Sequence, residues 1–347
     1  MSGVTRTFAP SDDAARALQL VQSLQSRFAA GLESVAADAG TPTALQRHEW
    51  LRDGGRHGGG DRLGTHGGIF NRASINVSQV HYSDMPQKPL ASANALSTII
   101  HPTHPRAPSV HIHISWTKLR EGRGYWRMMA DLNPAIPIEA DRARFAEALK
   151  AVAPQQYASA SEQGDRYFYI PALQRHRGVT HFYLEDYATD EPEADAALAE
   201  AVGRTAIDTY LRILRDAVVD APPPTDDDRA AQLRYHTVYL FQVLTLDRGT
   251  SSGLLVHADN DLGIMGSLPS HVDRALLASW RDRVDAPYEA LVDGLVAALP
   301  DESPAPVTDD AKVALAQAVR DFFRAHPEAL RQQASGGIAV PTVANHK

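Results

Sequence analysis

The sequence contains no cysteine among its 347 residues. This absence excludes disulfide bonds, thiolate nucleophiles and zinc–cysteine sites, so any bound metal would depend on histidine and carboxylate side chains. Lysine is scarce, with five residues, and the formal net charge of −8 comes without any long basic block. The clustered lysine and arginine of a nucleic-acid-binding surface are therefore missing.

Long apolar runs are missing as well, although 44% of the residues are hydrophobic. No stretch reaches the roughly 20 apolar residues of a membrane-spanning helix. The opening "MSGVTRTFAP" also lacks the apolar core of a secretion signal. We therefore expect a cytoplasmic protein without nucleic-acid or membrane partners.

Helical and strand patterns are both present. Residues 11–40 predict a helix, because Ser11 is a suitable N-cap and apolar residues follow at helical spacing. Further helices are expected over 138–153, 195–219, 286–299 and 308–330. Candidate strands cover 69–82, 96–100, 109–116, 125–132, 179–187, 236–247 and 252–258. This mixture predicts one broad antiparallel or mixed sheet of about seven strands flanked by helices.

Residues 53–68, "DGGRHGGGDRLGTHGG", contain eight glycines and follow neither a helical nor a strand period. A phosphate-binding loop is one interpretation, but the Walker pattern is absent. We expect a flexible or tightly turned surface loop.

Four histidines, His101, His104, His111 and His113, fall within thirteen residues. His111 and His113 are two apart in "SVHIHISW", so on a strand they face the same side. An imidazole-rich group of this kind is typical of Zn, Fe, Cu or Mn sites. Ordinary hydrogen bonding is the alternative for each ring.

Two acidic positions could also carry chemistry. Asp131 ends a predicted strand, where a carboxylate either caps a turn or points into a cleft as a base. Asp247 and Arg248 are neighbours on another predicted strand, so we expect them to face opposite sides.

Taken in order from about residue 15 to 280, these segments resemble the oxygen-dependent coproporphyrinogen III oxidase family. Ser97, His101 and His111 keep the spacing of the family's Ser-x₃-His-Pro core. The segments similar to family blocks are "EWLRDGGRHGGG", "GGIFNRASINVSQVHY", "LSTIIHPTHPRAPSVHIHIS", "ADLNP", "DRYFYIP" and "LDRGTSSGLL".

The resemblance implies a broad antiparallel sheet between helices, an α+β fold, and a homodimer. It also implies oxidative decarboxylation of propionates to vinyl groups by O₂, without flavin or haem. Asp131 would take the pyrrole N–H proton, and His111 and Arg248 would position substrate or peroxide. We assign residues 1–285 to a coproporphyrinogen oxidase-like catalytic domain and 286–347 to a C-terminal helical extension with a frayed tail.

The sequence departs from the family at substrate-facing positions. His113 and Ser115 stand where the resemblance places Asn and Arg, and His257, Ala258 and Asp259 stand where it places Gly-Gly-Arg. Bidentate arginine is the usual carboxylate clamp, so these changes disfavour a tetracarboxylate substrate. The candidate substrate-binding residues are Ser97, His113, Ser115, His257 and Asp259.

Three hypotheses follow. The first is a divergent O₂-dependent oxidase that oxidises, with or without decarboxylation, a smaller pyrrole- or indole-like substrate in secondary metabolism. His101, His111 and His113 would then hold a divalent metal if one binds. The second is a genuine coproporphyrinogen III oxidase of haem biosynthesis, and the third is a non-catalytic tetrapyrrole- or metal-binding protein. In the second, the lost arginines would be replaced by others, such as Arg106, Arg127 or Arg177.

Overall fold

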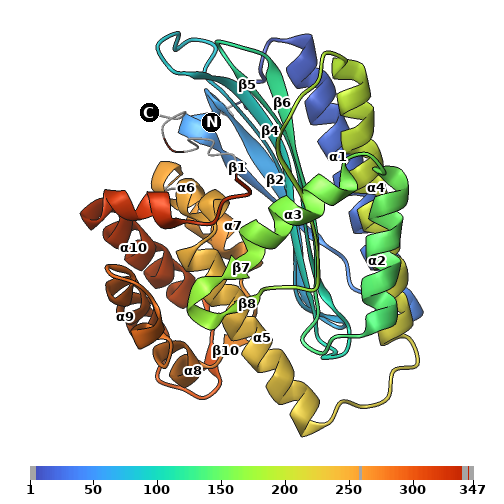
Figure 1. Cartoon of the computed structure of the whole chain (residues 1–347), viewed down its shortest axis with the longest axis vertical. Coiled ribbons are helices and arrows are strands. Elements are labelled where there is room, and N and C mark those ends of the chain that lie inside the picture. The colour runs from blue at the N-terminus through green and yellow to red at the C-terminus, as the bar shows by residue number, and fades with distance from the viewer. Residues whose placement is uncertain (1–4, 258–259, 338–342, 344–347) are drawn as a thin grey trace.

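A seven-stranded antiparallel sheet forms the centre of the computed structural model, which describes residues 5–257, 260–337 and 343. Figure 1 shows this sheet nearly edge-on, with helices on both sides. The predicted α+β fold is therefore confirmed. In spatial order the strands are β1 (Gln46–Leu51), β2 (Gly58–Gly67), β3 (Phe70–His81), β4 (Leu90–Pro102), β5 (Ser109–Leu119), β6 (Gly124–Asn133) and β9 (Thr180–Tyr187).

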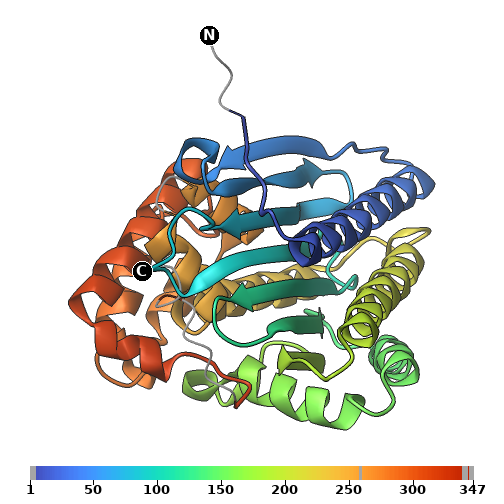
Figure 2. The ribbon, with the colours of Figure 1, turned by 90° about the horizontal axis from the view of Figure 1, so that it is seen from above.

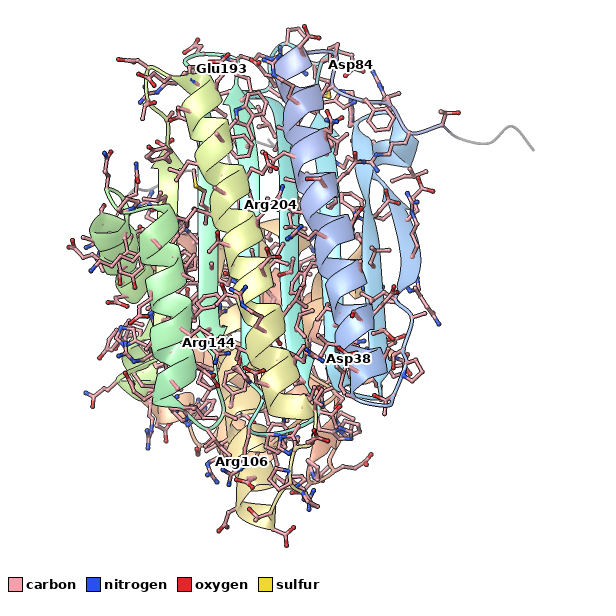
Figure 3. All side chains as sticks on the ribbon, turned by 90° about the vertical axis from the view of Figure 1, so that its right-hand side faces the viewer. Asp38, Asp84, Arg106, Arg144, Glu193 and Arg204 are labelled. Atoms are coloured by element: carbon pink, nitrogen blue, oxygen red, sulfur yellow. The ribbon has the colours of Figure 1, made fainter. Side chains whose placement is uncertain are left out.

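Three long helices cover one face of the sheet and lie side by side in Figure 3. They are α1 (Asp12–Asp38), α2 (Glu139–Val152) and α4 (Pro192–Val218). The first confirms the predicted N-terminal helix, and Ser11 caps it by accepting a hydrogen bond from the Ala14 backbone N–H. Alternate strand residues such as Val110 and Ile112 are buried in the apolar core beneath these helices.

A second layer of helices covers the opposite face, as Figure 2 shows. It contains α5 (Asp226–Thr245), α6 (Arg248–Val256), α7 (Asp261–Ile264), α8 (Arg274–Ala278), α9 (Tyr288–Ala298) and α10 (Asp309–Ala325). Two short strand pairs join it, β7 (Tyr169–Ile170) with β8 (Arg175–His176) and β10 (His271–Val272) with β11 (Ala305–Pro306). Helix α3 (Tyr157–Phe168) lies along strand β9 at the edge of the sheet (Figure 2).

Helices α5, α9 and α10 share a second apolar core on this side. The region after residue 285 therefore packs directly on helices that precede it, and the division of the chain at that point stays a prediction. Within the part of the chain that the structure describes, no helix is long and apolar enough to cross a bilayer.

The strands predicted over 236–247 and 252–258 are wrong, because residues 236–245 belong to helix α5 and residues 252–256 to helix α6. Every residue from 235 to 245 is buried, so this part of α5 is enclosed on all sides. A helix of that kind has no polar stripe, and its sequence cannot be distinguished from a buried strand by periodicity. A capping box at Thr225 begins α5, and Asp247 caps α6.

The loop predicted over 53–68 is also wrong, because Gly58–Gly67 forms strand β2 between β1 and β3. A Cβ added at Gly60 would lie 2.5 Å from both Trp50 Nε1 and the Val77 carbonyl oxygen. The glycines therefore permit close packing rather than a flexible loop. The largely exposed strand β1 was not predicted at all.

Candidate active site

A cavity of about 270 Å³ lies between the sheet and the second helical layer. The predicted residues Ser97, His111, His113, Arg248 and His257 line it. Other lining residues include Trp50, Asn76, Arg127, Met129, Tyr167, Arg177, Tyr183, Tyr239 and Asp247. Of the remaining predictions, Asp259 lies outside the described residues, and His101, Ser115 and Asp131 do not line the cavity.

The alternation of side chains along β5 explains why polar residues line the cavity. In β5 the apolar residues Val110, Ile112 and Ile114 enter the core below α1 and α4, so His111 and His113 face the opposite side. The register of β5 with β6 places His111 across from Asp131, His113 across from Met129, and Ser115 across from Arg127. Tyr183 follows from the same alternation in β9, and sequence reasoning missed it.

Asp131 lies at the centre of a hydrogen-bonded network beneath the cavity. Its side chain is fully buried, with one oxygen 2.9 Å from His111 Nδ1. The other oxygen accepts hydrogen bonds from Arg177 Nη2 at 2.6 Å and Asn133 Nδ2 at 2.6 Å. Burial alone would raise the pKa of the Asp131 carboxyl, but Arg177 and His111 hold it well below its usual range. Asp131 is therefore ionised.

This network fixes the tautomer of His111. An ionised carboxylate can only accept hydrogen bonds, so His111 Nδ1 carries the proton and donates it to Asp131 at 2.9 Å. Arg177 Nη2 also lies 3.3 Å from this nitrogen, but it donates to Asp131 at the shorter distance of 2.6 Å. In the neutral ring, Nε2 is then a hydrogen-bond acceptor on a side chain that lines the cavity. Asp131 orients this base from behind the ring.

The two β5 residues that differ from the family pattern, His113 and Ser115, are hydrogen-bonded to each other. His113 Nε2 lies 3.0 Å from the Ser115 hydroxyl. Burial, the charge of Arg127 and the nearby His111 hold the pKa of His113 well below its usual range, so its ring is neutral.

The three arginines considered as replacements have different surroundings. Arg106 lies outside the cavity and forms an ion pair with Asp228 at 3.2 Å. Arg177 forms an ion pair with Asp131. Arg127 lines the cavity, and its Nε atom is buried without a hydrogen-bond partner. Its position opposite Ser115 could not be inferred without the strand register.

The start of α6 forms a second charged group in the cavity. Asp247 accepts hydrogen bonds from the Thr250 backbone N–H at 2.7 Å and the Tyr167 hydroxyl at 3.0 Å. Arg248 forms an ion pair with the buried Glu185. The expectation that Asp247 and Arg248 are strand neighbours is therefore wrong, since one is the N-cap and the other the first residue of a helix.

His257 closes another side of the cavity. Its Nδ1 lies 2.9 Å from Arg52 Nη1, and its ring packs against Trp50 with 5.5 Å between ring centroids. The adjacent predicted position Asp259, like Ala258, lies outside the described residues.

The three predicted metal ligands are not brought together. His101 is fully buried away from the cavity, with Nδ1 2.8 Å from the Ser109 hydroxyl and its ring against Tyr239. Across the described ranges, no group of three or more His, Asp or Glu side chains could hold a metal ion. The residues present do not fit the predicted metal.

The fold and the cavity define an α+β protein with a polar, histidine-containing site on one face of an antiparallel sheet. The family model for coproporphyrinogen III oxidase matches residues 16–285, which is more than half of the chain. The chain therefore belongs to the coproporphyrinogen III oxidase family.

Curated relatives agree with this membership at modest identity. The chain is 27% identical over 245 residues to the oxygen-dependent coproporphyrinogen-III oxidase of Rickettsia bellii (strain OSU 85-389), covering 67% of this chain and 85% of that protein. It is 26% identical to the enzyme of the same name from Rickettsia rickettsii (strain Sheila Smith), with the same coverage. For the one from Synechococcus sp. (strain CC9902), identity is 27% over 300 residues, or 75% and 80% of the two chains.

Proposed function

We propose that this protein is an O₂-dependent oxidase of a pyrrole- or indole-like substrate smaller than coproporphyrinogen, with His111 accepting the ring N–H. The observation that carries the proposal is the Asp131–His111 hydrogen bond, 2.9 Å long, behind a cavity-lining imidazole. Family membership supports the oxidase chemistry. The smaller substrate is supported by His113 and Ser115, which occupy positions where the resemblance places Asn and Arg.

In the proposed reaction, Nε2 of His111 accepts a hydrogen bond from the substrate N–H. As the proton moves to the imidazole, Asp131 stabilises the imidazolium that forms. Arg177 and Asn133 keep the Asp131 carboxylate ionised and in place. The deprotonated ring is more electron-rich, which favours its reaction with O₂.

O₂ is the electron acceptor, so no further oxidant is needed. A simple dehydrogenation has the balance RH₂ + O₂ → R + H₂O₂. For a propionate side chain the balance is R–CH₂–CH₂–COO⁻ + O₂ + H⁺ → R–CH=CH₂ + CO₂ + H₂O₂. In that case a C–H bond and the bond to the carboxyl carbon break, a C=C bond forms, and the hydrogen leaves with two electrons to O₂.

A second candidate is oxidation of coproporphyrinogen III itself, which is favoured by the names of the relatives at 26–27% identity. A third is a binding protein without catalysis. A metal bound to His101, His111 and His113 remains a sequence-based hypothesis that the described geometry does not support, and no step above uses it.

The test is O₂ uptake and H₂O₂ release under air, with products identified by mass spectrometry. The substrates are coproporphyrinogen III, 3-(pyrrol-3-yl)propionate and indole-3-propionate, and His111→Gln is the matched control. Turnover of a single-ring substrate that is lost in the variant would support the proposal. Turnover of coproporphyrinogen III alone would establish the second candidate. Tight binding without O₂ uptake would leave the third.

A further inference from the structure

Arg127 is an unusual charge in this cavity. Among the described residues it has no ion-pair partner and no hydrogen-bond acceptor, and its Nε is buried. The other two arginines that line the cavity each face a carboxylate, Arg177 with Asp131 and Arg248 with Glu185. The residue as a whole is partly buried and lines the cavity, so its guanidinium faces the cavity without a protein anion, whereas buried charges are normally paired.

The groups around Arg127 do not supply the missing anion. Tyr125, Tyr167 and Tyr183 act on it electrostatically but are neutral phenols whose pKa values burial raises further. Asp247 also acts on it electrostatically, but it forms no ion pair with Arg127, and its carboxylate accepts hydrogen bonds from Thr250 and Tyr167. The guanidinium of Arg127 is therefore available to bind a ligand carboxylate in the cavity.

We propose that Arg127 is the carboxylate clamp of this cavity and that the ligand carries one carboxylate there, rather than four. The identity of the ligand's ring rests on the proposed function, whereas the assignment of Arg127 as the carboxylate clamp does not. Arg127 lies directly across from Ser115 in the register of β6 with β5. The arginine that the resemblance places at position 115 has thus been replaced by one on the neighbouring strand.

The position of the clamp also limits the shape of the ligand. The strand row with His111 and Asp131 is four residues from the row with Ser115 and Arg127. At 3.3–3.4 Å per residue, the two rows are roughly 13 Å apart along the strands. Because the long side chain of Arg127 covers part of this distance, a ring placed at His111 with its carboxylate on a short side chain, as in an aryl-propionate, fits the two groups better than a ring that carries the carboxylate directly.

The first test uses the full chain and a ring-free probe. Sodium propionate should raise the melting temperature of the wild type at constant ionic strength, and Arg127→Gln should abolish this shift. Arg106→Gln, which removes an arginine outside the cavity, should leave it unchanged. An equal propionate shift in Arg127→Gln and the wild type would overturn the clamp.

The second test compares indole-3-propionate with its neutral amide by isothermal titration calorimetry. One charge-assisted hydrogen bond contributes roughly 1.5–3 kcal/mol, so the acid should bind about 10- to 150-fold more tightly than the amide. Arg127→Gln should remove this preference and Arg127→Lys should restore part of it. Equal affinity of acid and amide for the wild type would refute the inference. A propionate shift without turnover of any aryl-propionate would retain the clamp and reject the proposed oxidase.

Discussion

The two faces of the central sheet carry opposite chemistry, although the same strands build both. Along β5, Val110, Ile112 and Ile114 are fully buried under α1 and α4, while the intervening His111 and His113 line the cavity. One face therefore consists of side chains that need no polar partner. The other consists of polar groups whose positions depend on their partners.

The two helical layers differ in the same way. Helices α1, α2 and α4 contain no histidine, and their ion pairs lie at the surface, such as Arg144 with Asp216. Figure 3 shows charged residues of this layer, among them Arg144, Arg204 and Asp38. The opposite layer buries His236 in α5, and the buried Arg177 donates a hydrogen bond to Gln242 of the same helix. The comparison indicates that one side stabilises the sheet and the other holds the reactive groups.

The largest expected effect is on turnover, from a change on the cavity face. His111→Gln should lower the rate of substrate oxidation roughly 10²- to 10⁴-fold, the usual contribution of a general base. Initial rates of O₂ uptake at saturating substrate would measure it, with circular dichroism to confirm folding. If turnover were retained, the proposed role of His111 would be wrong.

The next largest effect is on stability, again on the cavity side. Asp131→Asn should lower the free energy of unfolding by roughly 3–5 kcal/mol, because Arg177 would be left buried without a counter-charge. Urea unfolding at neutral pH measures the loss. The double variant Asp131→Leu with Arg177→Met should lose less than the single variant, since it removes both charges. A loss below 1 kcal/mol in the single variant would contradict the network.

On the sheet face covered by α1 and α4, Ile112→Ala should lower the free energy of unfolding by roughly 2–5 kcal/mol, because the substitution leaves a cavity in the core. Ser97→Ala, on the cavity face of the neighbouring strand, is the control and should change it by about 0.5 kcal/mol or less. Both values come from urea unfolding. Equal losses in the two variants would remove the distinction between the faces.

The smallest effect is a pH dependence confined to the cavity-side layer. Burial lowers the pKa of His236 to about 3, whereas the unfolded side chain titrates near its usual value of about 6.5. Between these values the unfolded chain binds the extra proton, so the free energy of unfolding should fall as pH falls below about 6.5. The slope from this one group approaches 1.4 kcal/mol per pH unit.

His236→Phe keeps a ring in the same place and should reduce that slope by up to the same amount between pH 6 and 4.5. Urea unfolding of both proteins across this range gives the comparison. Parallel curves would mean that His236 does not titrate on unfolding.

Much of the fold was predictable because it depends on local patterns. The N-terminal helix and five of the seven sheet strands were predicted from capping and periodicity. Helix α5 was not, because burial on every side removes the polar stripe on which recognition of a helix depends. Strand β2 was missed because its glycines meet a tertiary requirement, the close approach of β1 and β3.

For the site, the sequence by itself determined that His111 and His113 share one face of a strand, since alternation is a property of the local backbone. Only the tertiary structure decided which groups meet that face. The Arg177–Asp131 pair joins residues 46 apart, and Arg127 lies opposite Ser115 through the strand register. Such contacts depend on register and burial, which pair residues far apart in the chain and which no local pattern encodes.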